Sequence, residues 1–360
     1  MSSPEELELE QALAPFLTVG AVLVLPISTL SAMFLTYGIY ILIFGVSIRV
    51  LLRPGRPTTI SNLYLPCTIF SFIMATIYVG TVTAKYVHQA VLCFTTVKTK
   101  EYLQLAEFLT YDVESAVEFA LMVLTGALMN IVADCMLIHR CYACWGFRRA
   151  ILIPLVVMAV ALDGLDFITS IGGIANFNTS IPGHSELYDK FGIISNGDGI
   201  AIAAFNMLLT VLTAGRIWWT SRKDLKGAQN QEMFSFFTAA IIESGAMFSI
   251  TKLVAMIVPL VVDPNLHGLV PIDLATLAVL LSGLAPTLII VRVAYRSKSN
   301  PQAEQNENFI SRSMAFADRP VGQSACQSPS VDLRSQIGGH KGGNSSGEEG
   351  LASGSSEKMV

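Results

Sequence analysis

The stretch that decides the fold is Asn130-Ile-Val-Ala-Asp-Cys-Met-Leu-Ile-His-Arg-Cys-Tyr-Ala-Cys-Trp-Gly146. It ends a long apolar helix that contains an acid, Asp134, and it opens a short basic loop that carries Arg148 and Arg149. Basic residues directly after an apolar segment indicate the cytoplasmic end of a transmembrane helix. We therefore orient the rest of the chain from this stretch.

The composition is that of a membrane protein. Of the 360 residues, 52% are hydrophobic and only 14% are charged, which is too apolar for a soluble domain of this length. The net charge of -4 and the absence of a basic stripe with interleaved aromatic residues give no indication of nucleic-acid binding. Acidic residues follow Met1 where a secretory signal would be basic, so we expect no cleaved signal peptide.

Seven apolar segments are long enough to cross a bilayer, which takes about 20 helical residues. We predict an all-α, polytopic bundle of seven transmembrane helices at 27–52, 62–84, 113–139, 150–174, 197–219, 234–262 and 269–295. Pro26 separates the first span from an apolar pre-helix at 13–25, which either lies on the membrane surface or is re-entrant. Residues 85–112 form the first long connection, in which Leu103, Leu105, Phe108 and Leu109 predict a short interfacial helix.

Lysine and arginine are distributed unevenly between the two sides of the predicted bundle. Thirteen follow spans 1, 3, 5 and 7, whereas the N-terminus and the other connections hold four: Lys85, Lys98, Lys100 and Lys190. This bias places the N-terminus outside. We expect an extracellular N-terminus and pre-helix at 1–26, a seven-transmembrane domain at 27–296, and a disordered cytoplasmic tail at 297–360, because the tail has few large apolar residues.

Ionisable residues inside spans are candidates for function because they are costly in hydrocarbon. At 1.5 Å per residue, Asp134 and Glu243 lie roughly 8 and 10 Å from the inner ends of their spans. They predict an inner charge cluster with the arginines at the span ends, made of Asn130, Asp134, Arg140, Arg216, Glu243 and Arg292. This cluster is either a switch that opens a cytoplasmic cleft or a static pairing of buried charges.

The outer third of the spans is acidic. We predict a vestibule that attracts a cationic ligand, formed by Glu114, Glu118, Asp163, Asp166, Asp198 and Asp273 together with the cation Lys252. The depth of Lys252 matches that of Asp166 and Asp163, so we expect an ion pair with one of them. The alternative is that several of these acids end spans and are simply hydrated.

Two kinds of modification are predicted. Asn178-Thr-Ser is an acceptor for N-glycosylation on the predicted outer side. Cys141 and Cys144 lie near the expected lipid headgroups, where they are either palmitoylated or inert. Cys135 and His139 lie close to them, yet no second pair of metal ligands is evident, so we expect no metal site and no cofactor.

Three stretches carry a resemblance: Asp134-Cys-Met-Leu-Ile-His-Arg-Cys-Tyr-Ala-Cys-Trp-Gly146, Ile241-Ile-Glu-Ser-Gly-Ala-Met-Phe-Ser-Ile250 and Gly283-Leu-Ala-Pro-Thr-Leu-Ile-Ile-Val-Arg-Val293. Over residues 30–296 the chain resembles a large, functionally obscure family of seven-helix integral membrane proteins expanded in mushroom-forming (basidiomycete) fungi. The resemblance implies a seven-helix fold with a receptor-like outline. His139 stands where that family more often has an aromatic residue.

Taken together, these features favour a receptor-like plasma-membrane protein. We expect it to sense an unknown small ligand in the outer vestibule and to signal to a cytoplasmic protein through its basic loops, with membrane lipid as its surroundings. One alternative is a small-solute or proton-coupled transporter with Asp134, Glu243 and Lys252 as relay groups. An odd span count without internal repeats counts against it. The other is a structural membrane protein without a ligand. No phosphate-binding loop or nucleophile motif indicates an enzyme.

Overall fold

The computed structural model describes residues 13–53, 58–100, 102, 105–106, 108, 112–178, 180–224, 228–262 and 270–299. The chain divides into two units, Met1–Asp318 and Arg319–Val360, and every described residue belongs to the first. Residues 1–12 and 300–360 lie outside the described part. The predictions of an outside N-terminus and a disordered tail therefore stay predictions.

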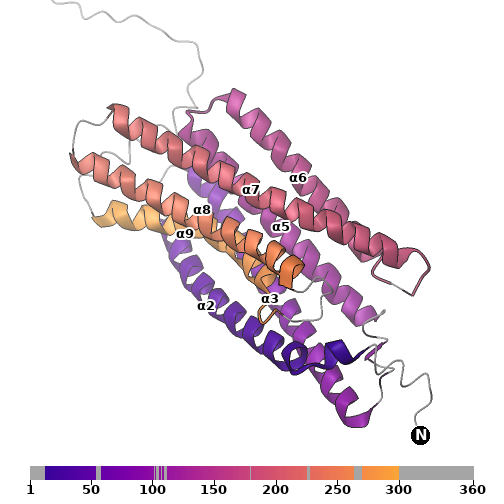
Figure 1. The fold of residues 1–360 in the computed structure, drawn as a ribbon. Coiled ribbons are helices and arrows are strands. Elements are labelled where there is room, and N and C mark those ends of the chain that lie inside the picture. Colours follow the sequence, from indigo (N-terminus) through magenta and orange to yellow (C-terminus); the bar gives the residue numbers. More distant parts are fainter. Residues whose placement is uncertain are drawn as a thin grey trace, which may run out of the picture. The chain divides into compact units, whose positions relative to one another are not determined.

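Seven long helices form the described part of the chain (Figure 1). They are α2 (Leu25–Leu51), α3 (Thr58–Thr99), α5 (Val113–Cys144), α6 (Arg149–Ala175), α7 (His184–Asp224), α8 (Ala228–Val262) and α9 (Leu274–Ser299). Each contains a segment long and apolar enough to cross a membrane, and the described residues contain no strand. The prediction of an all-α, seven-helix membrane bundle is confirmed.

The chain before α2 is helical as well. A 3-10 turn, η1 (Ala14–Leu17), is followed by a π-helical turn, η2 (Gly20–Val24), which runs directly into α2. Pro26 falls in the first turn of α2, where a missing N–H costs little. Pro26 therefore does not separate a pre-helix from the first span, and the apolar span begins at Gly20.

Three helices extend well beyond their predicted ends. The α3 helix continues to Thr99 and α7 begins at His184, because a helix can continue past its apolar segment, where hydropathy no longer detects it. The α5 helix continues to Cys144, and Gly146, whose φ of +68° is accessible to glycine, turns the chain away after the C-cap residue Trp145. Phe147 N–H then donates to the Tyr142 carbonyl at 3.1 Å and closes the helix end.

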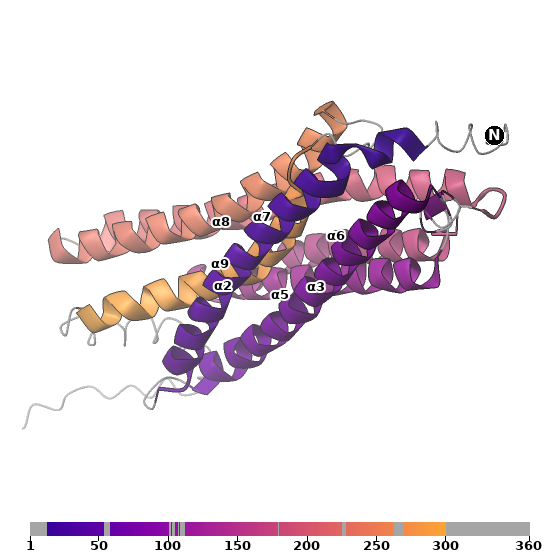
Figure 2. The ribbon, with the colours of Figure 1, turned by 90° about the horizontal axis from the view of Figure 1, so that it is seen from below.

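The helices pack in two different ways. An apolar core joins α2, α3, α5 and α9, and its fully buried members include Met33, Tyr40, Met129 and Leu280. On the other side, α7 lies along α8 and between α8 and α6, as Figures 1 and 2 show. We name the two ends of the bundle the Val113 end and the Cys144 end, after the first and last residues of α5.

Glycines set the distance between α7 and α8. A Cβ atom on Gly245 would lie 2.1 Å from Thr210 Oγ1 and 2.9 Å from Thr210 Cβ. A Cβ atom on Gly199 would lie 3.2 Å from Met256 Sδ and 3.7 Å from Lys252 Cε. The two helices run antiparallel, since the contact nearer the end of α8 falls nearer the start of α7.

Candidate functional site

One lysine lies among four acids in the middle of the helices. Lys252 of α8 interacts electrostatically with Asp166 of α6, Asp198 of α7 and Asp134 of α5. Asp163 of α6 in turn lies close enough to interact electrostatically with Asp134 and Asp198. We call these five residues the acidic cluster. It joins residues of four helices. The estimated depth of each residue in its span could not predict which helices are neighbours.

Two acids of this cluster are deeply buried, and three of the four hold an oxygen without a hydrogen-bond partner in the described part of the chain. Asp134 is 2% exposed and Asp198 is 3% exposed. Within the described residues, Asp134 Oδ2, Asp163 Oδ1 and both oxygens of Asp198 accept no hydrogen bond. Buried oxygens without partners are uncommon and call for a bound proton, ion or water.

Gly199, which follows Asp198 in α7, lies beside the Lys252 side chain: a Cβ atom at this position would lie 3.7 Å from Lys252 Cε, at ordinary contact distance. Lys252 forms no direct ion pair within the part of the chain that the structure describes. The predicted ion pair with Asp166 or Asp163 is therefore not formed. Lys252 instead interacts electrostatically at longer range, most strongly with Asp166 and less strongly with Asp198.

The predicted inner charge cluster is not a single group. Asp134 was expected beside Glu243 but lies with Asp163, Asn206 and Lys252. The reason is that α5 ends at Cys144 and not at 139. The extra residues put Asp134 about 15 Å from the helix end. Asn130, one turn earlier on α5, is buried as well.

Two predicted members of the inner cluster bind elsewhere. Arg140 donates from Nη2 to the Pro286 carbonyl of α9 at 2.7 Å and lies 5.4 Å from the centre of the Tyr64 ring. Arg216 lies 5.2 Å from the centre of the Trp145 ring. Arg140 thus has a backbone and an aromatic partner and Arg216 an aromatic one, and neither is among the groups that influence Asp134.

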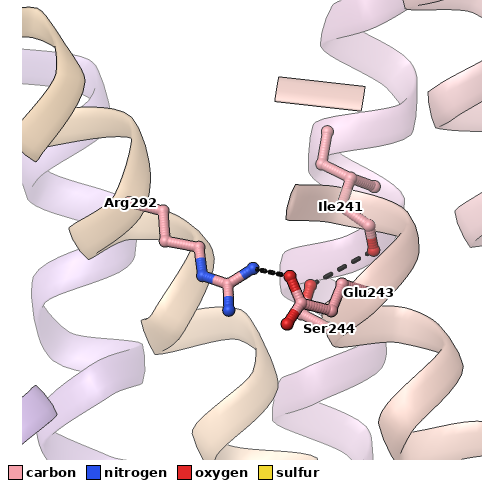
Figure 3. Close-up of polar contacts among 4 residues, drawn as sticks. All are labelled: Ile241, Glu243, Ser244 and Arg292. Carbon is pink, nitrogen blue, oxygen red and sulfur yellow. Dashed lines mark hydrogen bonds and ion pairs between the residues drawn. The ribbon is translucent and has the colours of Figure 1, made fainter. Parts of the chain in front are cut away.

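The remaining two members pair with each other at the Cys144 end. Arg292 Nη1 of α9 donates to Glu243 Oε2 of α8 at 2.5 Å, as Figure 3 shows. The side chain of Glu243 is 67% exposed. The hydroxyl of the next residue, Ser244, donates a hydrogen bond to the Ile241 carbonyl of its own helix. This is a surface ion pair between α8 and α9, and the prediction of a buried Glu243 is wrong.

The predicted outer vestibule divides into three sets of charges. Asp163, Asp166 and Asp198 belong to the acidic cluster. Asp273 and Glu118 face a second lysine, Lys85 of α3, which sequence reasoning assigned to a loop. Asp273 also caps α9, accepting from Ala275 N–H at 2.9 Å and from the Thr276 hydroxyl at 2.6 Å. Lys85 was missed because the apolar window ends one residue before it.

A third set lies at the Val113 end. His88 Nδ1 lies 3.7 Å from Glu114 Oε2, and one ligand atom each from His88, Asp112 and Glu114 fall within 4.8 Å of one another. This spacing is compatible with a metal ion. Asp112 already caps α5 by accepting from Ser115 N–H at 3.3 Å, and the side chain of Glu114 is 79% exposed. We assign no metal to these residues.

The predicted modification sites differ in accessibility. Cys141 is fully buried against Ile138, Leu155 and Leu209, so an acyl chain has no room there and the palmitoylation prediction is wrong for this thiol. Cys144 is half-buried, and its palmitoylation stays a prediction. Asn178 lies between α6 and α7 and accepts from Ser180 N–H at 3.1 Å; its glycosylation also stays a prediction.

Comparison with known proteins identifies no relative from which a function could be inferred. The chain matches no protein-family model, and neither a curated protein nor a solved structure is detectably similar to it. The resemblance to the fungal membrane-protein family stays a prediction. What the seven apolar helices establish is a multi-pass membrane protein.

Proposed function

We propose that this protein is a receptor-like plasma-membrane protein that binds a small cationic ligand at the acidic cluster. The observation that carries the proposal is the charge of the cluster within the membrane-spanning helices: one ammonium group interacts with three carboxyl groups, and a fourth, that of Asp163, lies near two of them. Unbalanced charge is costly at this depth. A positively charged ligand would balance carboxylates that Lys252 leaves uncompensated.

Helix α8 would transmit binding to the rest of the bundle. It carries Lys252, packs closely on α7 at Gly245, and is paired with α9 through Glu243. A cation bound between Asp166 and Asp198 competes with Lys252 for the same carboxylates, so it favours another position of α8. With the Cys144 end in the cytoplasm, as the basic residues predict, this movement reaches a cytoplasmic signalling protein.

A thermal-shift screen on the purified protein tests this function. Protonated amines and quaternary ammonium compounds should raise the melting temperature, and neutral analogues of the same shape should not. Asp198→Asn should remove the response. The matched control is Asp189→Asn, an exposed acid on the same helix, which should keep it. Equal responses to charged and neutral compounds would contradict a cationic ligand.

One observation favours a proton-coupled transporter as a second candidate. Buried polar residues follow one face of α7, namely Asp198, Asn206, Thr210 and Thr213, at the spacing of a helical stripe. Such a row suits proton relay along the helix. Liposomes with reconstituted protein and an internal pH dye would decide. Solute-dependent proton uptake that Asp134→Asn abolishes would favour transport over sensing.

A further inference from the structure

The contacts between α7 and α8 fix which residues face each other across their interface. Gly245, Ser249, Lys252 and Met256 repeat at helical spacing on one face of α8. The first meets Thr210 of α7, and the last two meet Gly199. In an antiparallel pair with these two contacts, the residue opposite Ser249 is Asn206, which lies between Gly199 and Thr210. Ser249 and Asn206 therefore face each other in the middle of the bundle.

Both side chains are buried and hold an oxygen without a partner. Ser249 is 0% exposed and its hydroxyl makes no hydrogen bond among the described residues. Asn206 is 2% exposed; its amide nitrogen donates to the Ile202 carbonyl at 3.1 Å, while its Oδ1 accepts nothing from the described residues. Asp134 of α5 lies beside Asn206, and its Oδ2 is equally unpartnered.

These three oxygens come from a carboxylate, an amide and a hydroxyl, which are hard ligands. Hard oxygens suit hard metal cations rather than soft ones. A single carboxylate in the set favours a single positive charge, since divalent cations usually collect several carboxylates. Potassium sites are built from rings of backbone carbonyls, and here the α5, α7 and α8 backbones are helical throughout.

The charges that face Asp134 allow for one more positive charge. Asp163 approaches it from α6 and Lys252 from α8, while α7 contributes the neutral Asn206. Lys252 also interacts with Asp166 and Asp198, and both of these interactions are stronger than its interaction with Asp134. A cation beside Asp134 thus meets more negative than positive charge.

We propose that Asp134, Asn206 and Ser249 bind a sodium ion between α5, α7 and α8. This site shares Asp134 with the acidic cluster, but it does not depend on the amine ligand proposed above, which lies between Asp166 and Asp198. The ion cross-links three helices that otherwise meet at unsatisfied oxygens. Sodium therefore stabilises the bundle, with water completing its coordination.

The test compares melting temperatures of the purified protein in sodium, potassium and choline chloride at equal ionic strength. Sodium should raise the melting temperature by several degrees in a saturable way, and potassium and choline should not. Ser249→Ala should remove the sodium effect. Ser244→Ala is the matched control, since this serine is equally buried on α8 but already bonds its own helix; it should keep the effect.

Two further measurements protect the test against folding defects. Direct binding of radioactive sodium to the unaltered protein should be saturable and abolished by Asp134→Asn. Equal melting temperatures in all three salts, or equal behaviour of the two serine variants, would overturn the proposal. So would a response to pH without one to sodium, because a proton alone would then neutralise Asp134. The amine screen stands or falls separately, through Asp198→Asn.

Discussion

The two sides of the bundle are built on opposite principles. Where α2, α3, α5 and α9 meet, the fully buried side chains are large and apolar, such as Met129 and Leu280. Where α7 meets α8, the buried residues include Asp198, Asn206 and Ser249. Helices in a bilayer associate through close packing rather than through the hydrophobic effect. The apolar side packs in this way without burying charge in its core, so the polar side is where function is to be sought.

The largest effect is expected on the apolar side. Leu280→Ala should lower the free energy of unfolding by about 2 to 5 kcal/mol, because it leaves a cavity in a fully buried core. Leu42, which is 72% exposed, is the control, and Leu42→Ala should change little. Denaturant unfolding in detergent measures both. Similar losses for the two variants would mean that the core is not the source of stability.

On the polar side, Lys252→Met should destabilise by about 3 kcal/mol, since it leaves Asp166 and Asp198 without their cation. Lys190→Met is the control: Lys190 is exposed and pairs with Glu186 one turn away on α7. The same unfolding measurement applies. A Lys252→Met protein as stable as the unaltered one at neutral pH would show that the cluster does not need its ammonium group.

The glycine contact between α7 and α8 sharpens the comparison further. Gly245→Ala should destabilise by about 1 to 3 kcal/mol, because Thr210 Cβ lies too close for a side-chain rotation to relieve the clash. Gly80 of α3 has no atom near its Cβ position. There, alanine should be neutral or stabilising through its better helix propensity. Melting curves of both variants would reveal whether close approach is special to the polar side.

The smallest effect is expected from the ion pair at the Cys144 end. Glu243→Gln should leave the melting temperature unchanged within error, because the Glu243 side chain is 67% exposed and exposed pairs contribute little. A clear fall would mean that the α8–α9 pair holds the bundle together.

Sequence reasoning predicted the helices but not the site, and the difference has a physical cause. Hydropathy detects apolar segments, so all seven spans were found. It cannot detect how far a helix continues in water, which is why α3 and α7 were too short and Lys85 was taken for a loop residue. An end placed five residues early also moved Asp134 to the wrong depth.

The sequence also did not predict which residues of different helices lie beside each other. Asp134 and Glu243 match in depth, but depth does not say which face of a helix a residue occupies or which helix lies beside it. The association of Asp134 with Asn206 depends on the packing of α5 against α7. The sequence does mark Asn206, since it is an uncharged amide in the middle of an apolar span.

The length of α3 has a practical consequence for imaging this molecule. With 42 residues it measures about 63 Å, against a hydrocarbon thickness of about 30 Å. Even at a tilt of about 40° it would rise about 48 Å along the membrane normal. Rigid helical rods that project from the detergent belt give electron microscopy images a feature by which particles can be aligned, without an added antibody fragment.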